Sequence, residues 1–228
     1  MSVFFVLNMS FYPSYQQQYS ALSLEHKEAL KHIPYLKDIE GWLLLEEAAE
    51  LFLLASSISS PRPVICEIGV WKGKSSYILA TAIRNRGGVL YSIDPFDGDG
   101  DSASRDLYQK EMEVMPISLL QNFKETLRRY DLSQTVRILP HLSLEARKKF
   151  DETAIDMLFI DGNHDYASVR EDYTLWSSLL VSGGVLVLHD VEAKHVDGPR
   201  LVMKECVPKS PAWRDSRVVG EMGIAVKN

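Results

Sequence analysis

From Val64 onward, short apolar runs alternate with segments in which apolar residues recur every three or four positions. The runs are typical of strands buried on both faces, and the spaced segments are typical of amphipathic helices. Five strands are predicted over residues 64–68, 89–94, 135–139, 155–161 and 184–190. Helices are predicted over residues 75–83, 104–130, 144–150 and 167–180. This alternation predicts a parallel sheet with helices on both faces.

The two ends of the chain follow other patterns. Residues 23–33 predict an amphipathic helix with Ser23 as its N-cap, and a second helix is predicted from about Leu43 to Ser57. Residues 217–228 hold two short apolar runs around 221–223, which predicts a hairpin at the sheet edge. The expected fold is therefore α/β, with a doubly wound, mostly parallel seven-stranded sheet and a C-terminal antiparallel hairpin.

Composition narrows the class of protein. The chain has 228 residues and a net charge of −6, whereas proteins that grip nucleic-acid phosphates usually carry a basic excess. Two cysteines form no disulfide framework, so a reducing, cytoplasmic setting is expected. The apolar stretch near the N-terminus is much shorter than the roughly 20 residues of a membrane span and lacks a basic region before it. We expect no nucleic-acid or membrane partner.

The most informative segment is a glycine turn between the first strand and the next helix. Gly69 and Gly73 allow a sharp backbone turn beside a ligand, and Asp94 ends the second strand 21 positions after Gly73. An acid at about this distance binds ribose hydroxyls in many nucleotide-binding α/β proteins. The segment thus predicts a ligand that contains a ribose, although a bare strand–helix turn is the alternative.

The spacing of this turn favours one such ligand. It has one residue fewer than a P-loop and lacks the dinucleotide-binding pattern. Glu67 also disfavours an anionic pyrophosphate at this place. S-adenosylmethionine (SAM) carries no phosphate, and its ammonium group can be neutralised by an acid. A P-loop-like nucleotide kinase or ATPase remains the alternative.

Acids and histidines follow the fourth and fifth strands. Asp161 and Asp190 end these strands, His164 follows Asp161 by three residues, and His189 precedes Asp190. Ligands of open parallel sheets bind at this end of the strands. A cation between two acids would lower the pKa of a hydroxyl, and a histidine could take its proton. An imidazole at position 189 weakens the case for magnesium, which prefers oxygen ligands.

The acidic run at Asp97, Asp99 and Asp101 invites comparison with a calcium loop. It lacks the glycine and the glutamate that an EF-hand needs. We therefore predict a solvated loop that, together with the helix after it, forms part of a lid over the substrate.

Four segments resemble the motifs of class I SAM-dependent O-methyltransferases. They are CEIGVWKGKSS (66–76), YSIDPFDGD (91–99), FIDGNHDYASVREDY (159–173) and GGVLVLHDV (183–191). The resemblance is to the macrocin O-methyltransferase and cephalosporin-hydroxylase-like group, and more distantly to catechol O-methyltransferases. It implies a Rossmann-like SAM-binding domain over residues 61–228, with residues 1–60 as a tail and entry helices of the same domain.

The resemblance also implies roles for single residues. Glu67 and Gly69 would face the methionine part of SAM, Gly73 and Ser75 would complete the turn, and Asp94 would accept the ribose hydroxyls. Ser143 would lie beside the adenine, where His141 departs from the usual glycine.

At the reacting end, Asp161, His189 and Asp190 would bind Mg²⁺ or another divalent cation, with His164 as the base. The implied acceptor is a hydroxyl on a small molecule such as a sugar or natural product. The N-terminal tail and the edge hairpin are candidate contacts in a homo-oligomer. A catalytically silent SAM-binding module is a further alternative.

Overall fold

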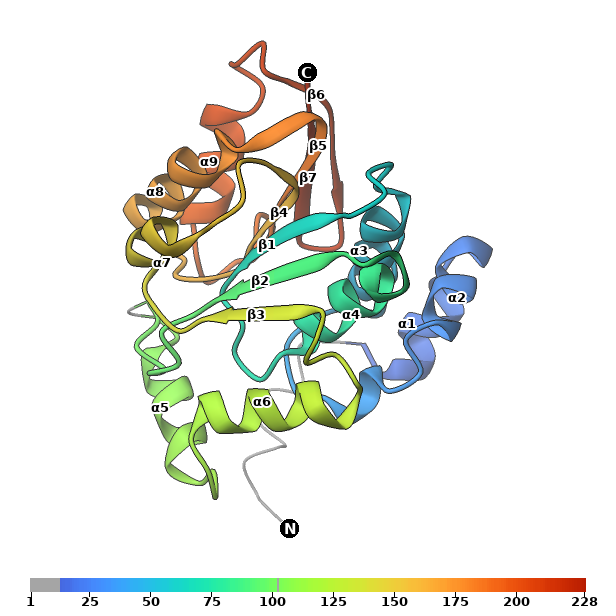
Figure 1. Ribbon diagram of the computed structural model, residues 1–228, viewed down its shortest axis with the longest axis vertical. Helices are drawn as coiled ribbons and strands as arrows, with labels where there is room; N and C mark the ends of the chain where they lie inside the picture. Colours follow the sequence, from blue (N-terminus) through green and yellow to red (C-terminus); the bar gives the residue numbers. More distant parts are fainter. Residues whose placement is uncertain (1–12, 102) are drawn as a thin grey trace.

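The computed structural model describes residues 13–101 and 103–228. Its sheet has the strand order β3-β2-β1-β4-β5-β7-β6 (Figure 1). The strands are β1 (Val64–Ile68), β2 (Val89–Ile93), β3 (Val136–Leu139), β4 (Ile155–Ile160), β5 (Leu180–Leu188), β6 (Trp213–Val219) and β7 (Met222–Lys227). Strands β1 to β5 pair in parallel, whereas β7 is antiparallel to both β5 and β6. The expected fold, a mostly parallel seven-stranded sheet with a C-terminal hairpin, is confirmed.

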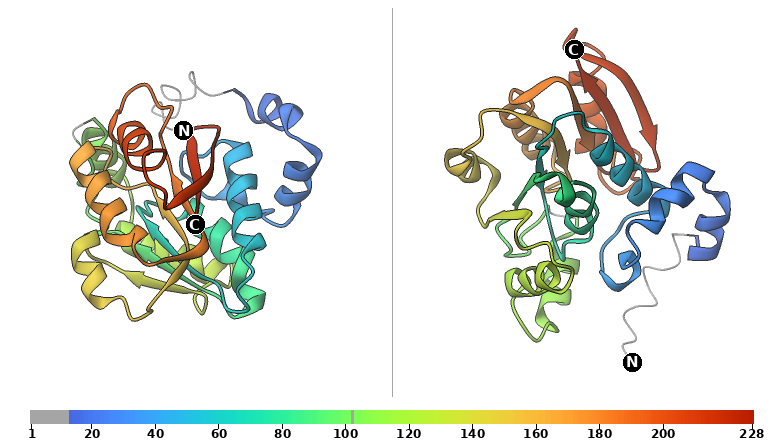
Figure 2. Two further views of the ribbon diagram at one scale, coloured as in Figure 1. Left: turned by 90° about the horizontal axis from the view of Figure 1, so that it is seen from above. Right: turned by 45° about the vertical axis from the view of Figure 1, so that its right-hand side comes forward.

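Helices cover both faces of this sheet (Figures 1 and 2). They are α1 (Tyr15–Ala21), α2 (Leu24–Lys31), α3 (Leu45–Ser57), α4 (Lys74–Ile83), α5 (Arg105–Glu113), α6 (Leu119–Arg129), α7 (Ser143–Lys149), α8 (Tyr166–Ser177) and α9 (Gly198–Cys206). One apolar cluster joins α2, α3, α4 and α6 to the sheet, and a second joins α7, α8 and α9 to its other face. The strands are therefore buried from both sides, as their apolar runs predicted.

The N-terminal helices belong to the first of these layers. Ser23 caps α2, because its Oγ accepts a hydrogen bond from the backbone N–H of His26 at 3.0 Å. Helix α3 begins at Leu45, two residues after the expected start. Its buried residues share one apolar cluster with α4, so α3 packs beside α4 on the same face of the sheet.

Other boundaries also differ from the sequence expectation. The single helix expected over 104–130 is two helices, because Pro116 interrupts the backbone hydrogen bonds and Ser118 caps α6. Strand β5 begins at Leu180, four residues early, since α8 already ends at Ser177. The hairpin turns at residues 220–221, and Met222 starts β7.

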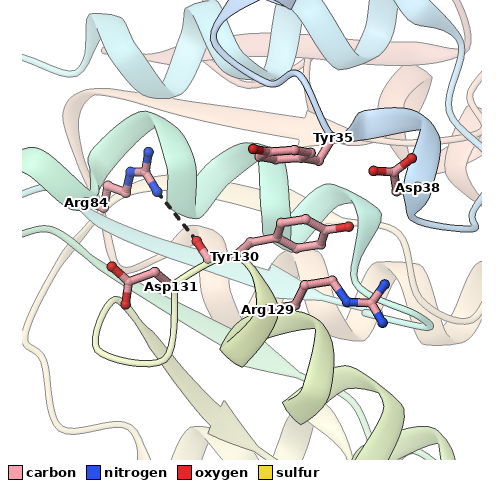
Figure 3. Close-up of a pocket in the computed structure, with 6 residues that line it drawn as sticks. All are labelled: Tyr35, Asp38, Arg84, Arg129, Tyr130 and Asp131. Atoms are coloured by element: carbon pink, nitrogen blue, oxygen red, sulfur yellow. Dashed lines mark hydrogen bonds between the residues drawn. The ribbon is translucent and has the colours of Figure 1, made fainter.

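Among the described residues, no helix combines the length and the apolar character needed to cross a bilayer. A surface cavity of about 590 Å³ lies where α4 and α6 end (Figure 3). The rings of Tyr35 and Tyr130 stack there, 5.1 Å apart, and Arg84 donates to the carbonyl of Tyr130. Because α4 begins at the glycine turn and Arg84 follows its other end, this cavity is separate from the site described below.

Candidate functional site

A second cavity, of about 690 Å³, opens at the carboxyl ends of β1, β4 and β5. Its wall contains Gly69 after β1, Asp161 after β4, and His189 and Asp190 after β5. The segment before α3 and one side of α5 complete the wall. Parallel strands place their following loops at one edge, and this is the edge where open α/β sheets bind ligands.

The two turn glycines are required by close packing. Gly69 has a φ of +85°, and a Cβ built on it would lie 2.0 Å from the carbonyl oxygen of Asp161. Gly73 has a φ of +89°, and its Cβ would lie 2.6 Å from the ring of Phe123. The β1–α4 turn can therefore lie against β4 and α6 only with glycine at both positions.

Asp94 holds this turn through backbone hydrogen bonds. Its Oδ2 accepts from the N–H groups of Val70 at 2.8 Å and Trp71 at 3.2 Å, and its Oδ1 accepts from Phe96 at 2.6 Å. Burial raises the pKa of Asp94, while these three donors act in the opposite direction. A carboxylate has about four acceptor sites, so these three donors leave about one unfilled.

Glu67 lies within β1 and is fully buried. Its Oε2 accepts hydrogen bonds from Ser76 at 2.5 Å and Ser92 at 2.9 Å, whereas its Oε1 is buried without a partner among the described residues. Burial raises the pKa of Glu67 to about 7. A buried carboxylate oxygen without a donor is costly, which favours a cationic donor from a ligand at this point.

Of the two serines assigned to the cofactor, only Ser75 lines the cavity. Ser75 lies in the first turn of α4 and lines the cavity, as expected for a residue that completes the turn. Ser143 begins α7, and its Oγ accepts a hydrogen bond from the indole N–H of Trp176 at 2.8 Å. The side chain of Ser143 thus contacts α8 rather than the cavity.

Acids and histidines meet at the bottom of the cavity. His164 Nε2 lies 2.9 Å from Asp190 Oδ2 and 3.9 Å from Asp161 Oδ1. His189 Nδ1 lies 3.2 Å from Asp161 Oδ1 and 3.3 Å from Asp190 Oδ2. Both nitrogens are buried, yet neither makes a well-aligned hydrogen bond to a described residue. One donor atom each from Asp161, His164 and Asp190 lies within 4.8 Å of the others, a spacing that could hold a metal ion.

The electrostatics of this group favour histidinium beside carboxylate. Burial alone would lower the pKa of His164, but Asp101, Asp161 and Asp190 outweigh it and raise that pKa to about 11. The pKa of His189 is raised for the same reason. Burial would raise the pKa of Asp190, but its contacts with the two histidines hold it well below the usual range.

Two carboxylates that the sequence analysis did not assign to the site complete the group. Asp101 was expected in a solvated loop, but it is only 2% exposed and its Oδ2 lies 2.6 Å from His164 Nδ1. Glu47 of α3 is 1% exposed, lies 3.3 Å from His189 Nε2 and accepts from the backbone N–H of Glu221 at 2.7 Å. Four carboxylates therefore surround two imidazoles, and negative charge prevails even when both imidazoles are protonated.

Three aromatic rings form one side of the cavity. Trp71 stacks on Trp42 at 5.8 Å between ring centroids and contacts Tyr108 of α5 at 4.7 Å. Trp71 adopts a φ of +50°, which is strained for a bulky residue and is held by Asp94. Lys72 pairs with Glu40 at 2.5 Å and Glu111 at 2.8 Å, so it joins the segment before α3 to the end of α5.

Residues 66–191, more than half of the chain, match the family model described as a methyltransferase domain. The chain belongs to this methyltransferase family. It is a class I SAM-dependent methyltransferase, as the four motifs predicted, and the kinase or ATPase alternative is set aside.

Solved structures share the fold at low sequence identity. The O-methyltransferase TomG from Streptomyces achromogenes, solved with SAM and involved in tomaymycin synthesis, is 20% identical with a TM-score of 0.59, covering 90% of both chains. An O-methyltransferase from Bacillus cereus, solved with S-adenosylhomocysteine (SAH), is 16% identical with a TM-score of 0.60, covering 93% of this chain and 96% of its own. The SAH-bound methyltransferase PaMTH1 from Podospora anserina is 13% identical with a TM-score of 0.58, covering 96% and 98%.

The methyltransferase has residues that fit SAM and a cation. The unpartnered Oε1 of Glu67 suits the ammonium group of the methionine part, because a buried carboxylate oxygen without a donor favours a cationic partner. The unpartnered Nδ1 of His189, together with the excess of carboxylates, suits a divalent cation with mixed oxygen and nitrogen ligands, and the unpartnered Nε2 of His164 beside the acids is free to accept a proton.

Proposed function

We propose that this methyltransferase transfers the methyl group of SAM to a hydroxyl of a small molecule, with a divalent cation bound at the ends of β4 and β5. The convergence of Asp161, His164 and Asp190 carries this proposal, because their donor atoms lie within 4.8 Å of one another in the wall of the cavity. Two acids at this spacing can hold a cation and the acceptor oxygen together.

The cofactor would lie across the ends of β1 and β2. Glu67 Oε1 would accept from the ammonium group, and the turn that Gly69 and Gly73 allow to pack against β4 and α6 would lie beside the cofactor. Ser75 would face it from the first turn of α4. Asp94 would add a ribose hydroxyl to the donors that it already accepts, and the backbone beside Ser143 would lie near the adenine.

The chain's own groups would orient and deprotonate the acceptor. Asp161 and Asp190 would hold the cation, with His189 against both of them. A bound cation supplies positive charge that lowers the pKa of a coordinated hydroxyl and of the neighbouring His164. Neutral His164 would then take the hydroxyl proton at Nε2. SAM, when bound, would supply the methyl group: the acceptor oxygen would bond to the methyl carbon while the carbon–sulfur bond breaks, with SAH as the product.

The aromatic side of the cavity favours an acceptor with an apolar face. Trp42, Trp71 and Tyr108 present ring surface to the cavity opposite a charged group of acids and histidines. An acceptor with one apolar face and one hydroxyl edge, such as a sugar ring or a natural product, fits both sides.

Methyl transfer from radiolabelled SAM to a panel of sugars, phenols and hydroxy acids tests the proposal. We expect transfer to a hydroxyl compound that rises with added Mg²⁺ or Mn²⁺, falls with chelator and is lost in Asp190→Asn. Asp165→Asn, which changes an exposed acid in the loop after β4, should keep activity. Transfer that ignores metal and Asp190, or SAH binding without transfer to any acceptor, would contradict it.

Three further properties are inferred: the location of the protein, its assembly and the bounds of its domain. A cytoplasmic location remains a prediction from the cysteine content, and a homo-oligomer remains a prediction from the chain ends. We also infer that residues 1–60 belong to the same domain as 61–228. The shared apolar cluster of α3 and α4 supports this.

A further inference from the structure

The buried carboxylate of Asp101 joins the lid region to the reacting histidine. Asp101 follows β2 in the chain, 63 positions before His164, and its Oδ2 lies 2.6 Å from His164 Nδ1. Its Oδ1 accepts hydrogen bonds from the backbone N–H groups of Ala103 at 2.8 Å and Ser104 at 2.9 Å. One carboxylate therefore contacts the imidazole and the residues that precede α5.

This contact determines which nitrogen of His164 carries a proton. An ionised carboxylate only accepts hydrogen bonds, so Nδ1 must be the donor. Burial would raise the pKa of Asp101, but the hydrogen bond to His164 outweighs it and keeps the pKa well below the usual range. When His164 is neutral, its lone pair is then on Nε2, which faces Asp161 and Asp190.

The same residue helps to seat α5. No side chain of α5 is buried, and the main-chain oxygen of Asp101 accepts from the N–H groups of Ser104 at 3.2 Å and Arg105 at 2.9 Å. Tyr108 of α5 then lies against Trp71 over the cavity. The start of the lid helix and the orientation of His164 thus depend on one side chain and its backbone.

We propose that Asp101 is a positioning residue, which holds His164 as the Nδ1–H tautomer with Nε2 toward Asp161 and Asp190 and couples this arrangement to the seating of α5. The effect of Asp101 on catalysis rests on the proposed function. The tautomer of His164 and the seating of α5 do not depend on which acceptor is methylated. An aspartate that orients a histidine in this way is a recurring device in sites that bind metals or move protons.

Nitrogen-15 NMR of the histidine side chains tests this directly, with His164 assigned by its loss in His164→Gln and with spectra taken at a pH above the His164 pKa, where the ring is neutral. In the neutral ring of the unsubstituted protein we expect the proton on Nδ1. In Asp101→Asn the amide oxygen can still accept from Ala103 and Ser104 while its NH₂ group faces the ring. That donor requires an unprotonated Nδ1, so the tautomer should switch to Nε2–H.

The switch should also weaken cation binding, because an Nε2–H aimed at the acids opposes a cation. We expect Mn²⁺ to bind Asp101→Asn about 10- to 100-fold more weakly, the usual effect of losing such a partner. The effect should vanish in a His164→Gln background, since Asp101 acts through that ring. Asp99→Asn is the matched control, because Asp99 lies in the same loop but is exposed and pairs with Arg105.

In the neutral ring, an unprotonated Nδ1 in the unsubstituted protein would overturn the proposal without any variant, as would an Nδ1 proton that persists in Asp101→Asn. If the protein binds no Mn²⁺, the position of the proton on the neutral ring of His164 decides whether the proposal stands. SAH binding, measured on the same samples, separates the two claims. Its absence from the unsubstituted protein would overturn the proposed function, whereas its retention in Asp101→Asn shows that the variant is folded.

Discussion

Gly69 and Asp161 approach each other so closely that no side chain fits between them. A Cβ on Gly69 would lie 2.0 Å from the carbonyl oxygen of Asp161, a backbone atom that cannot turn aside. This contact joins the end of β1 to the end of β4, where the cofactor turn meets the acid and histidine group. The packing of the fold and the placing of the site therefore depend on the same contact.

Gly69→Ala should destabilise the protein severely. Overpacking costs about 1–3 kcal/mol, and a left-handed φ adds about 1–2 kcal/mol, so we expect a loss above about 3 kcal/mol in urea unfolding. Gly87→Ala is the control, because Gly87 has a φ of +65° but nothing within 4 Å of its Cβ. It should lose only about 1–2 kcal/mol. Equal losses in the two variants would contradict the close contact.

SAH binding should depend on pH through Glu67. Burial raises the pKa of this acid in the free protein to about 7, and an ammonium group beside it would favour the ionised form. Affinity should therefore rise as the pH rises toward 7 and then level off. Calorimetric titrations from pH 5.5 to 8 measure this.

Glu67→Gln should bind SAH weakly and lose this pH dependence. Asp172→Asn is the control, because Asp172 is a buried acid of α8 whose pKa is raised by burial to about 6. It should keep the dependence. A Glu67→Gln variant with the unaltered pH profile would show that another group binds the ammonium.

Much of the fold was predictable because each element carries its own signal. The five buried strands are apolar runs, and Gly69 and Gly73 mark the turn after the first of them. The break between α5 and α6 was missed although Pro116 and Ser118 lie in it, since the amphipathic spacing continues across both helices. At this break, the proline and the N-cap serine are stronger signals of a new helix than the periodicity is of one continuous helix.

The site was only partly predictable, for a different reason. Asp161, His164 and Asp190 follow strands whose ends must meet, so topology places them together. Asp101 and Glu47 reach the same point from a loop and from an N-terminal helix, 63 and 142 positions from the histidines that they contact. The repeated acids around Asp101 look solvated in sequence, and only tertiary structure distinguishes the buried one.

Lys72 should stabilise α5. Its ammonium group joins Glu40 to Glu111, and its side chain is only 11% exposed. Lys72→Met should loosen α5 by about 1 kcal/mol, which makes its amide hydrogens exchange about fivefold faster. Hydrogen exchange of residues 105–113 measures this. Lys148→Met, which removes an exposed pair with Glu145, should leave α5 unchanged, and equal exchange in both variants would contradict the role of Lys72.

Asp190 should be required for cation binding. It adopts a φ of +60° directly after His189, so its carboxylate is held against both histidines by a strained backbone. We expect Asp190→Asn to weaken Mn²⁺ binding at least about tenfold in electron paramagnetic resonance titrations, with SAH affinity little changed. Unaltered Mn²⁺ affinity would show that the cation does not bind at Asp190.

The most direct test of the account is a calorimetric titration of the whole protein with SAH and, separately, with ATP. We predict micromolar binding of SAH that is lost in Asp94→Ala, because Asp94 holds the turn at which the cofactor would lie, and no binding of ATP. ATP binding at this turn, or no SAH binding with or without Mg²⁺ or Mn²⁺, would contradict the SAM site.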